Sequence, residues 1–234
     1  MRPSPSATVP GRPLLLGHRG ARREAQENTF PAFDLCLARG ADGFEFDVRR
    51  TADGRAVVFH DPALGGLEIA EHAHAVLRDR FQKLHSTDLP CLEEVLGRYA
   101  SRAFLDIELK VAGLEDAVVA LVQSESFLRG YVVSSFLPEV VESLRRCGPE
   151  VPTGFICDQP ALLPRWKSLP ADVLAIHRSL IRPELVADAQ MEGKRVFAWS
   201  VNQAKEMHRL AEMGADALIS DDPGLLCRTI SAAR

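Results

Sequence analysis

The sequence lacks any apolar run long enough to form a membrane span or the core of a signal peptide. Its 234 residues are 46% hydrophobic and 26% charged, which is typical of a globular protein. The first residues are rich in Pro and Ser, so we expect a disordered lead-in over 1–12. The length fits one large domain, and we expect a single one over 1–234.

Clusters of positive charge are also missing. Lys and Arg number 28 against 32 Asp and Glu, for a net charge of -4. No basic run and no stripe of basic and aromatic residues stands out, which argues against a nucleic-acid partner. No basic amphipathic helix is evident either, so we expect no stable membrane insertion.

Closely spaced cysteine pairs are absent. The five cysteines are odd in number and scattered along the chain. This spacing disfavours both a disulfide framework and a zinc cluster, and it predicts reduced thiols in a cytoplasmic protein.

What the sequence does contain is an alternation of short apolar segments with helical patterns. We predict strands at 14–17, 44–48, 57–60, 104–109, 131–135, 152–156, 173–176, 195–200 and 217–220. Such a βαβα rhythm indicates a parallel sheet with helices outside it. A doubly wound sheet is the alternative, but no Gly-x-Gly-x-x-Gly follows the first strand.

One connection breaks the rhythm. Only eight residues separate Val48 from Val57, and they include the turn signal Asp53-Gly54. A parallel crossover needs a dozen residues or more, so these two strands should be antiparallel. Setting 57–60 aside leaves eight strands, which predicts a (β/α)₈ TIM barrel with an added hairpin strand.

Residues 61–90 form the one long stretch that we predict to be irregular, ahead of a helix over 92–99. A loop of this length is usually a lid or a substrate-binding insertion. Among the helix ends, we expect Asn28 and Thr29 to act as caps, Glu27 as a first-turn acid, and Asn202 as the cap of a later helix.

Three acidic residues lie on strands that should otherwise be apolar. Glu45 and Asp47 in Gly43-Phe-Glu-Phe-Asp-Val48 share one strand face, and Glu108 lies in Phe104-Leu-Asp-Ile-Glu-Leu-Lys110. Buried carboxylates cost several kcal/mol each unless something compensates them. Ligands that offer only oxygen suit a hard divalent cation, Mg²⁺ or Ca²⁺ with Mn²⁺ also possible, so we predict a metal site here.

Basic and aromatic residues are predicted at the same end of the barrel, where catalytic residues of this fold gather. His18 and Arg19 follow the first strand, Lys110 follows Glu108, and His60-Asp61 follows the hairpin strand. Two imidazoles suit general acid and base, while Arg19 and Lys110 would hold an anion such as phosphate. Trp199 at its strand end could wall the pocket.

Other polar residues nearby have plainer interpretations. Asp106 shares the face of Glu108, and is either a support for the site or a salt-bridge partner deeper in the barrel. His177 follows a strand without an acidic neighbour, and we expect no catalytic role for it. We expect Asp221 and Asp222 to be solvated surface residues.

Taken together, these residues resemble the glycerophosphodiester phosphodiesterase family from about residue 14 to residue 225. The matching segments occur in the family's order: Gly17-His-Arg-Gly20, Glu27-Asn-Thr29, Gly40-Ala-Asp-Gly-Phe-Glu-Phe-Asp-Val48, Thr51-Ala-Asp-Gly54, His60-Asp61, Leu89-Pro-Cys-Leu-Glu-Glu-Val-Leu96, Ile107-Glu-Leu-Lys110, Ser134-Ser-Phe136, Trp199-Ser-Val-Asn202, and Ile219-Ser-Asp221 with Pro223.

The resemblance implies a TIM barrel that splits glycerophosphodiesters into an alcohol and glycerol 3-phosphate with a divalent metal. It implies that the metal ligands are Glu45, Asp47 and Glu108. His18 and His60 would be the acid and base, Arg19 and Lys110 would bind the phosphate, and Trp199 would border the glycerol moiety.

Two positions depart from the family pattern. Gln26 replaces the usual Pro, and Pro62-Ala-Leu-Gly-Gly66 begins a shorter segment than many members have after His60-Asp61. Because that segment helps to cover the substrate, a related barrel phosphodiesterase acting on lysophospholipids, or one forming a cyclic product, is an alternative. A non-catalytic metabolite-binding barrel is a further one.

Overall fold

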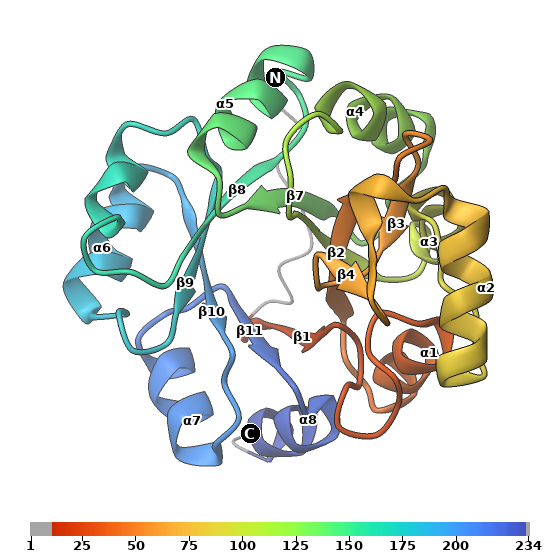
Figure 1. Cartoon of the computed structure of the whole chain (residues 1–234). Helices are drawn as coiled ribbons and strands as arrows, with labels where there is room; N and C mark the ends of the chain where they lie inside the picture. The colour runs from red at the N-terminus through yellow and green to blue at the C-terminus, as the bar shows by residue number, and fades with distance from the viewer. Residues whose placement is uncertain (1–10, 233–234) are drawn as a thin grey trace.

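A closed barrel of eight parallel strands forms the centre of the computed structural model, which describes residues 11–232 (Figure 1). The TIM barrel predicted from the sequence is therefore confirmed. The ring closes because β1 pairs in parallel with both β2 and β11. Its strands, in chain order, are β1 (Leu14–His18), β2 (Gly43–Arg50), β6 (Phe104–Leu109), β7 (Tyr131–Ser135), β8 (Thr153–Cys157), β9 (Val173–His177), β10 (Arg195–Trp199) and β11 (Ala217–Ser220).

The predicted antiparallel strand is β3 (Ala56–Val58), which pairs with the end of β2 so that Val48 lies opposite Val58. The strand is shorter than predicted. It ends at Val58, so His60 lies in the loop beyond it and not on the strand. This loop can carry the imidazole over the mouth of the barrel.

Helices surround the ring after all but one of its strands. The exception follows β8, where the chain forms only the short 3₁₀ helix η2 (Leu163–Lys167). Pro160 and Pro164 lie in this segment, and proline lacks the N–H that a continuing α-helix needs. The outer helices are α1 (Phe30–Ala38), α3 (Leu92–Tyr99), α4 (Glu115–Ser124), α5 (Pro138–Cys147), α6 (Pro183–Met191), α7 (Ala204–Glu212) and α8 (Pro223–Ser231).

Apolar side chains close the floor of the barrel beneath its polar end. Leu14, Leu16, Phe104 and Phe197 are buried there, and the two rings lie edge to face at 5.9 Å. Gly43 allows this packing, because a Cβ atom on it would lie 1.9 Å from the carbonyl oxygen of Phe104.

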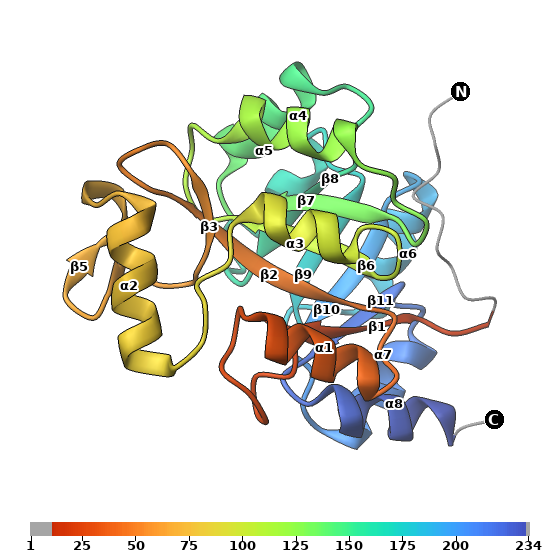
Figure 2. The ribbon, with the colours of Figure 1, turned by 90° about the vertical axis from the view of Figure 1, so that its right-hand side faces the viewer.

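We had predicted from the sequence that the insertion over 61–90 is irregular, and this prediction was wrong. It contains a small hairpin of β4 (Ala63–Leu64) and β5 (Leu67–Glu68), the 3₁₀ helix η1 (Ile69–Glu71), and α2 (His74–His85). Figure 2 shows α2 and β5 standing outside the ring of barrel helices. Leu77 and Phe81, one turn apart on α2, are buried.

The predicted lead-in over 1–12 falls mostly outside the described residues. Arg12, the last residue of that segment, is held in place, because its guanidinium makes a bidentate ion pair with Asp42 at 2.6 and 2.9 Å. All five cysteines lie in the described part of the chain and carry free thiols. None of the described helices is long and apolar enough to cross a membrane.

Candidate active site

Strand register brings the three predicted metal ligands together at the carboxyl end of the barrel. Asp47 on β2 lies opposite Glu108 on β6, and Glu45 lies opposite His18 on β1. One oxygen from each of the three carboxylates lies within 4.8 Å of the others, and all three residues are buried. The alternation of residues along β2 thus places both of its carboxylates inside the barrel, as predicted.

Burial and mutual repulsion make this cluster electrostatically unfavourable by itself. Burial raises the pKa of Glu45 well above its ordinary value, and the neighbouring Asp47 and Glu108 raise it further. Burial and Asp47 likewise raise the pKa of Glu108 to about 7. Burial alone would raise the pKa of Asp47 too, but Arg19 and Lys110 lower it below its usual value.

The donor set fits a hard divalent cation. Within the described chain, one oxygen of each carboxylate accepts no hydrogen bond: Glu45 Oε1, Asp47 Oδ1 and Glu108 Oε1. Lys110 Nζ lies 2.6 Å from Glu108 Oε1 and 3.4 Å from Asp47 Oδ1 as an ion-pair partner. Three inward-facing carboxylate oxygens of this kind are the ligands that Mg²⁺, Ca²⁺ and Mn²⁺ take.

Arg19 and Lys110 bring positive charge to the same rim. The guanidinium Nε of Arg19 lies 3.1 Å from Asp47 Oδ2, and the backbone N–H of the same residue donates to Glu45 Oε2 at 2.9 Å. Lys110 Nζ also lies 5.5 Å from the centre of the Phe136 ring. Burial disfavours both cations, but the surrounding carboxylates raise the pKa of each above its usual value, so both stay charged.

The segment before α1 contacts the three carboxylates and their neighbours, which our predictions for Glu27 and Asn28 missed. Thr29 caps α1, accepting from the N–H of Ala32, but Asn28 does not cap it. The Asn28 side chain instead donates to Asp47 Oδ2 at 2.8 Å. Glu27 lies ahead of the helix and bridges two guanidinium groups, those of Arg19 and Arg22, at 2.8 and 2.9 Å.

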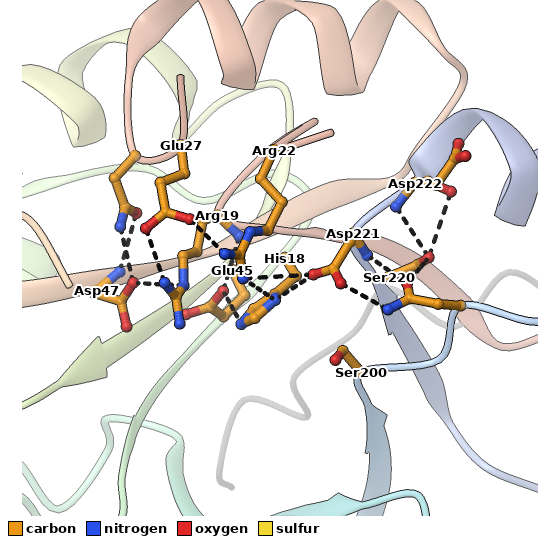
Figure 3. A network of polar contacts seen from close by, with 12 residues as sticks. His18, Arg19, Arg22, Glu27, Glu45, Asp47, Ser200, Ser220, Asp221 and Asp222 are labelled. Carbon is orange, nitrogen blue, oxygen red and sulfur yellow. Dashed lines mark hydrogen bonds and ion pairs between the residues drawn. The ribbon is translucent and has the colours of Figure 1, made fainter. Parts of the chain in front are cut away.

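The acidic partner of His18 is Asp221, which we had predicted to be a solvated surface residue. His18 Nδ1 lies 2.6 Å from Asp221 Oδ1, while its Nε2 lies 3.8 Å from Glu45 Oε2 (Figure 3). The prediction for Asn202 was wrong as well, because α7 begins after Gln203. Asn202 Nδ2 donates to Asp221 Oδ2 at 2.6 Å.

His60 is held from two sides. Its Nδ1 lies 2.7 Å from Asp61 Oδ1, and its backbone carbonyl accepts from Arg49 Nε at 2.6 Å. Arg49 shares the β2 face of Glu45 and Asp47, two residues beyond the second carboxylate. Burial lowers the pKa of His60 below its ordinary value, although Asp47 and Asp61 act in the opposite sense.

These side chains open into a pocket of about 250 Å³. His18, Glu45 and Glu108 line the side formed by the first strands, together with His60 from the loop after β3, and Trp199 walls the other side with Phe136. The Trp199 ring meets Phe136 edge to face at 5.5 Å, and its Nε1 donates to the carbonyl of Ala175 at 3.0 Å. The pocket therefore has one half that holds most of its charged groups and one aromatic half, formed by Phe136 and Trp199, whose one acidic residue is Asp158.

Two residues with open predictions also lie at or near the pocket. Asp106 lines it and accepts from the hydroxyl of Ser134 at 2.6 Å, one level below Glu108. Burial raises the pKa of Asp106 to about 6. His177 is hydrogen-bonded to the Ser179 hydroxyl, and its ring lies edge-on to that of Trp199, with the ring centres 5.4 Å apart. It is not among the residues that line the pocket.

The family model for the glycerophosphoryl diester phosphodiesterase family matches residues 18–225. The chain belongs to this family. It is therefore an enzyme, a phosphodiesterase, as the resemblance of its motifs implied. It is 27% identical to a glycerophosphodiester phosphodiesterase of Caldanaerobacter subterraneus subsp. tengcongensis, over 93% of this chain and 97% of that one.

Solved structures place this phosphodiesterase among the same relatives. It is 27% identical to a phosphodiesterase of Oleispira antarctica in complex with the product sn-glycerol-3-phosphate, with a TM-score of 0.81 over 94% of this chain and 97% of that one. It is also 27% identical to a glycerophosphodiester phosphodiesterase from Agrobacterium tumefaciens, with a TM-score of 0.79 over 92% and 99%.

All eight residues that the sequence predicted for the site of this phosphodiesterase lie at the mouth of the barrel: His18, Arg19, Glu45, Asp47, His60, Glu108, Lys110 and Trp199. Their individual roles remain predictions. Sequence reasoning missed three of their supports, namely Asn28, Arg49 and Asp221. The alternation along β2 could have identified Arg49, and the motif containing Asp221 could have identified that residue.

Proposed function

We propose that this phosphodiesterase hydrolyses glycerophosphodiesters to an alcohol and glycerol 3-phosphate, using a divalent cation and two histidines. The observation that carries the proposal is that three buried carboxylates, each with one oxygen that accepts no hydrogen bond, meet two imidazoles and two cations at the mouth of the barrel. The product bound to the relative from Oleispira antarctica supports the choice of substrate class.

Glu45, Asp47 and Glu108 would hold the cation. When bound, Mg²⁺, Ca²⁺ or Mn²⁺ supplies positive charge that neutralises the developing charge of the phosphoryl group and lowers the pKa of a nearby hydroxyl. Arg19 and Lys110 bind the anionic phosphate and orient it toward the histidines. The aromatic half of the pocket, with Trp199, receives the glycerol moiety.

His18 and His60 move the protons. One imidazole takes the proton of the nucleophile, and the other gives a proton to the departing alkoxide. The nucleophile is either the glycerol 2-hydroxyl, through a cyclic phosphate that water then opens, or water itself. In the first route the histidines exchange roles between the two steps.

The test is a panel of phosphodiesters followed by ³¹P NMR with and without EDTA. Glycerophosphocholine should yield glycerol 3-phosphate, EDTA should stop the reaction, and excess Mg²⁺, Ca²⁺ or Mn²⁺ should restore it. His18→Ala and His60→Ala should each lower turnover by at least ~10²-fold. His208→Ala is the matched control, because this imidazole lines a pocket at the opposite end of the strands and should leave turnover unchanged.

Two results would contradict the proposal. Release of phosphocholine would mean cleavage of the other ester bond, and EDTA-insensitive turnover would remove the cation from the mechanism. A lysophosphatidylcholine arm tests the second substrate class that the sequence left open, since faster release of choline there would assign the enzyme to lysophospholipids.

A further inference from the structure

The loop after β11 carries a carboxylate that reaches the first histidine across the barrel seam. Asp221 and His18 are 203 residues apart in sequence, yet the pairing of β1 with β11 places them side by side. Asp221 Oδ1 lies 2.6 Å from His18 Nδ1, and their side chains are 20% and 14% exposed. Figure 3 shows the carboxylate on the flank of the imidazole away from Glu45.

Asn202 fixes the orientation of this carboxylate. Its Oδ1 accepts from the N–H of Asp221 at 2.9 Å and from the hydroxyl of Ser220 at 3.0 Å. The backbone N–H can only donate, so the atom it meets is the amide oxygen, and the amide nitrogen of Asn202 faces Asp221 Oδ2 at 2.6 Å. One oxygen of Asp221 is therefore occupied, and the other is left for His18.

The short contact fixes the position of one proton. A carboxylate offers no hydrogen, so the atom that donates across 2.6 Å is Nδ1 of His18. The hydrogen bonds from His18 and Asn202 lower the pKa of Asp221 to about 2 in spite of its partial burial, which keeps it an acceptor. Arg22 Nη1 is the other donor nearby, but it lies 3.4 Å from Nδ1 and 3.7 Å from Asp221 Oδ1.

We propose that Asp221, oriented by Asn202, is a positioning residue that holds His18 with Nδ1 protonated and Nε2 presented to the phosphodiester. The inference rests on the proposed function in one respect, which is that His18 moves a proton in the reaction. A histidine with a fixed ring and a fixed tautomer is the arrangement that proton transfer requires.

The decisive test exchanges the two partners. Asp221→Asn alone puts an amide nitrogen against either Nδ1 of His18 or Nδ2 of Asn202, both donors, so kcat should fall by roughly 10²-fold with little change in KM. The double variant D221N/N202D restores every donor–acceptor pair, because the new carboxylate still accepts from the N–H of residue 221 and from Ser220. It should recover kcat to within about 3-fold of wild type.

A double variant that stays as slow as D221N would overturn the proposal, since hydrogen-bond geometry alone would then not explain the need for Asp221. A purely structural role is tested in the H18A background. There D221N should cost no further activity, and an additional loss of about 10²-fold would place the effect of Asp221 outside His18.

A spectroscopic readout separates this inference from the function itself. The ¹⁵N shifts of the His18 imidazole should report a protonated Nδ1 in the wild type, and a mixture of tautomers in D221N. This measurement needs no substrate, so it stays informative if the phosphodiester panel fails. If the wild type and D221N show the same distribution of tautomers, the proposal is contradicted.

Discussion

His18 and His60 are held in different ways. The carboxylate beside His18 is partly buried and fixed by Asn202, whereas the carboxylate beside His60 belongs to Asp61, whose side chain is 66% exposed. An exposed partner is weakened by water and salt, so it positions an imidazole poorly. The firmer support of His60 is the bond from Arg49 to its backbone carbonyl, which fixes the loop that follows β3.

Removal of the Arg49 guanidinium should therefore slow the reaction. Arg49→Met keeps the apolar stem but leaves the carbonyl of His60 without its donor, and a displacement of about 1 Å at a catalytic group can cost ~10²-fold in rate. We expect kcat to fall by roughly 10-fold to 10²-fold in steady-state kinetics, with the folded state retained. Arg50→Met is the matched control, since the neighbouring side chain is exposed and should leave kcat unchanged. A wild-type rate in Arg49→Met would show that Asp61 alone positions the imidazole.

How well single residues could be predicted depended on whether their contacts are local. Alternation along a strand is a local rule, and it placed Glu45, Asp47 and Glu108 correctly inside the barrel. Asn28 and Asp221 carry local signals of their own, for a helix cap and for solvent exposure. Contacts with Asp47 and His18, distant in sequence, override those signals. The motif that contains Asp221 marks the residue, but a single sequence does not reveal which side chain it contacts.

The insertion between β3 and α3 is a small structural unit with its own core. Phe81 on α2 is buried and meets Phe59 edge to face at 6.0 Å. The insertion was predicted as irregular because its hairpin strands are only two residues each and α2 is mostly polar, so the helical spacing of Leu77 and Phe81 was easily overlooked. The buried side chains form a cluster apart from the barrel cores: Val57, Leu64, Ile69, Leu77, Phe81, Leu89 and Cys91.

A cavity in this cluster should loosen the insertion and leave the barrel intact. Truncation of a buried Phe to Ala costs about 3–5 kcal/mol, and cooperative units with separate cores open separately. Phe81→Ala should raise amide hydrogen exchange in α2 by at least ~10²-fold while exchange in the barrel strands stays as in wild type. Gln82→Ala, at an exposed site on the same helix, is the control and should change neither. Equal acceleration in β6 and α2 would show that the insertion and the barrel unfold as one unit.

The whole barrel balances a stable floor against a charged mouth. Its strands alternate with helices in a rhythm that each short segment encodes, which explains why the fold was predictable from one sequence. The mouth works against that stability, because three carboxylates are buried close together and Arg19 and Lys110 offset their charge in part. Sites arranged for function commonly cost stability in this way.

A divalent cation should therefore stabilise the native protein. In the absence of the cation, removal of one carboxylate should also stabilise it. A ligand present at about 100 times its Kd that binds only the folded state adds ~2.7 kcal/mol, so the melting temperature should rise on addition of Mg²⁺, Ca²⁺ or Mn²⁺ after EDTA treatment. Glu45→Gln removes a negative charge whose Oε1 accepts no hydrogen bond, while the new amide oxygen can still accept from Arg19. In EDTA this variant should melt several degrees above wild type. We expect its free energy of unfolding to be higher by about 1–2 kcal/mol, and each kcal/mol raises the melting temperature by ~2–4 °C. The cation should then add little. Glu142→Gln, an exposed acid on α5, is the control and should behave like wild type in both conditions. If Glu45→Gln melts below wild type in EDTA, the carboxylate stabilises the metal-free barrel. The statement that the buried carboxylates lower the stability of the protein would then be wrong.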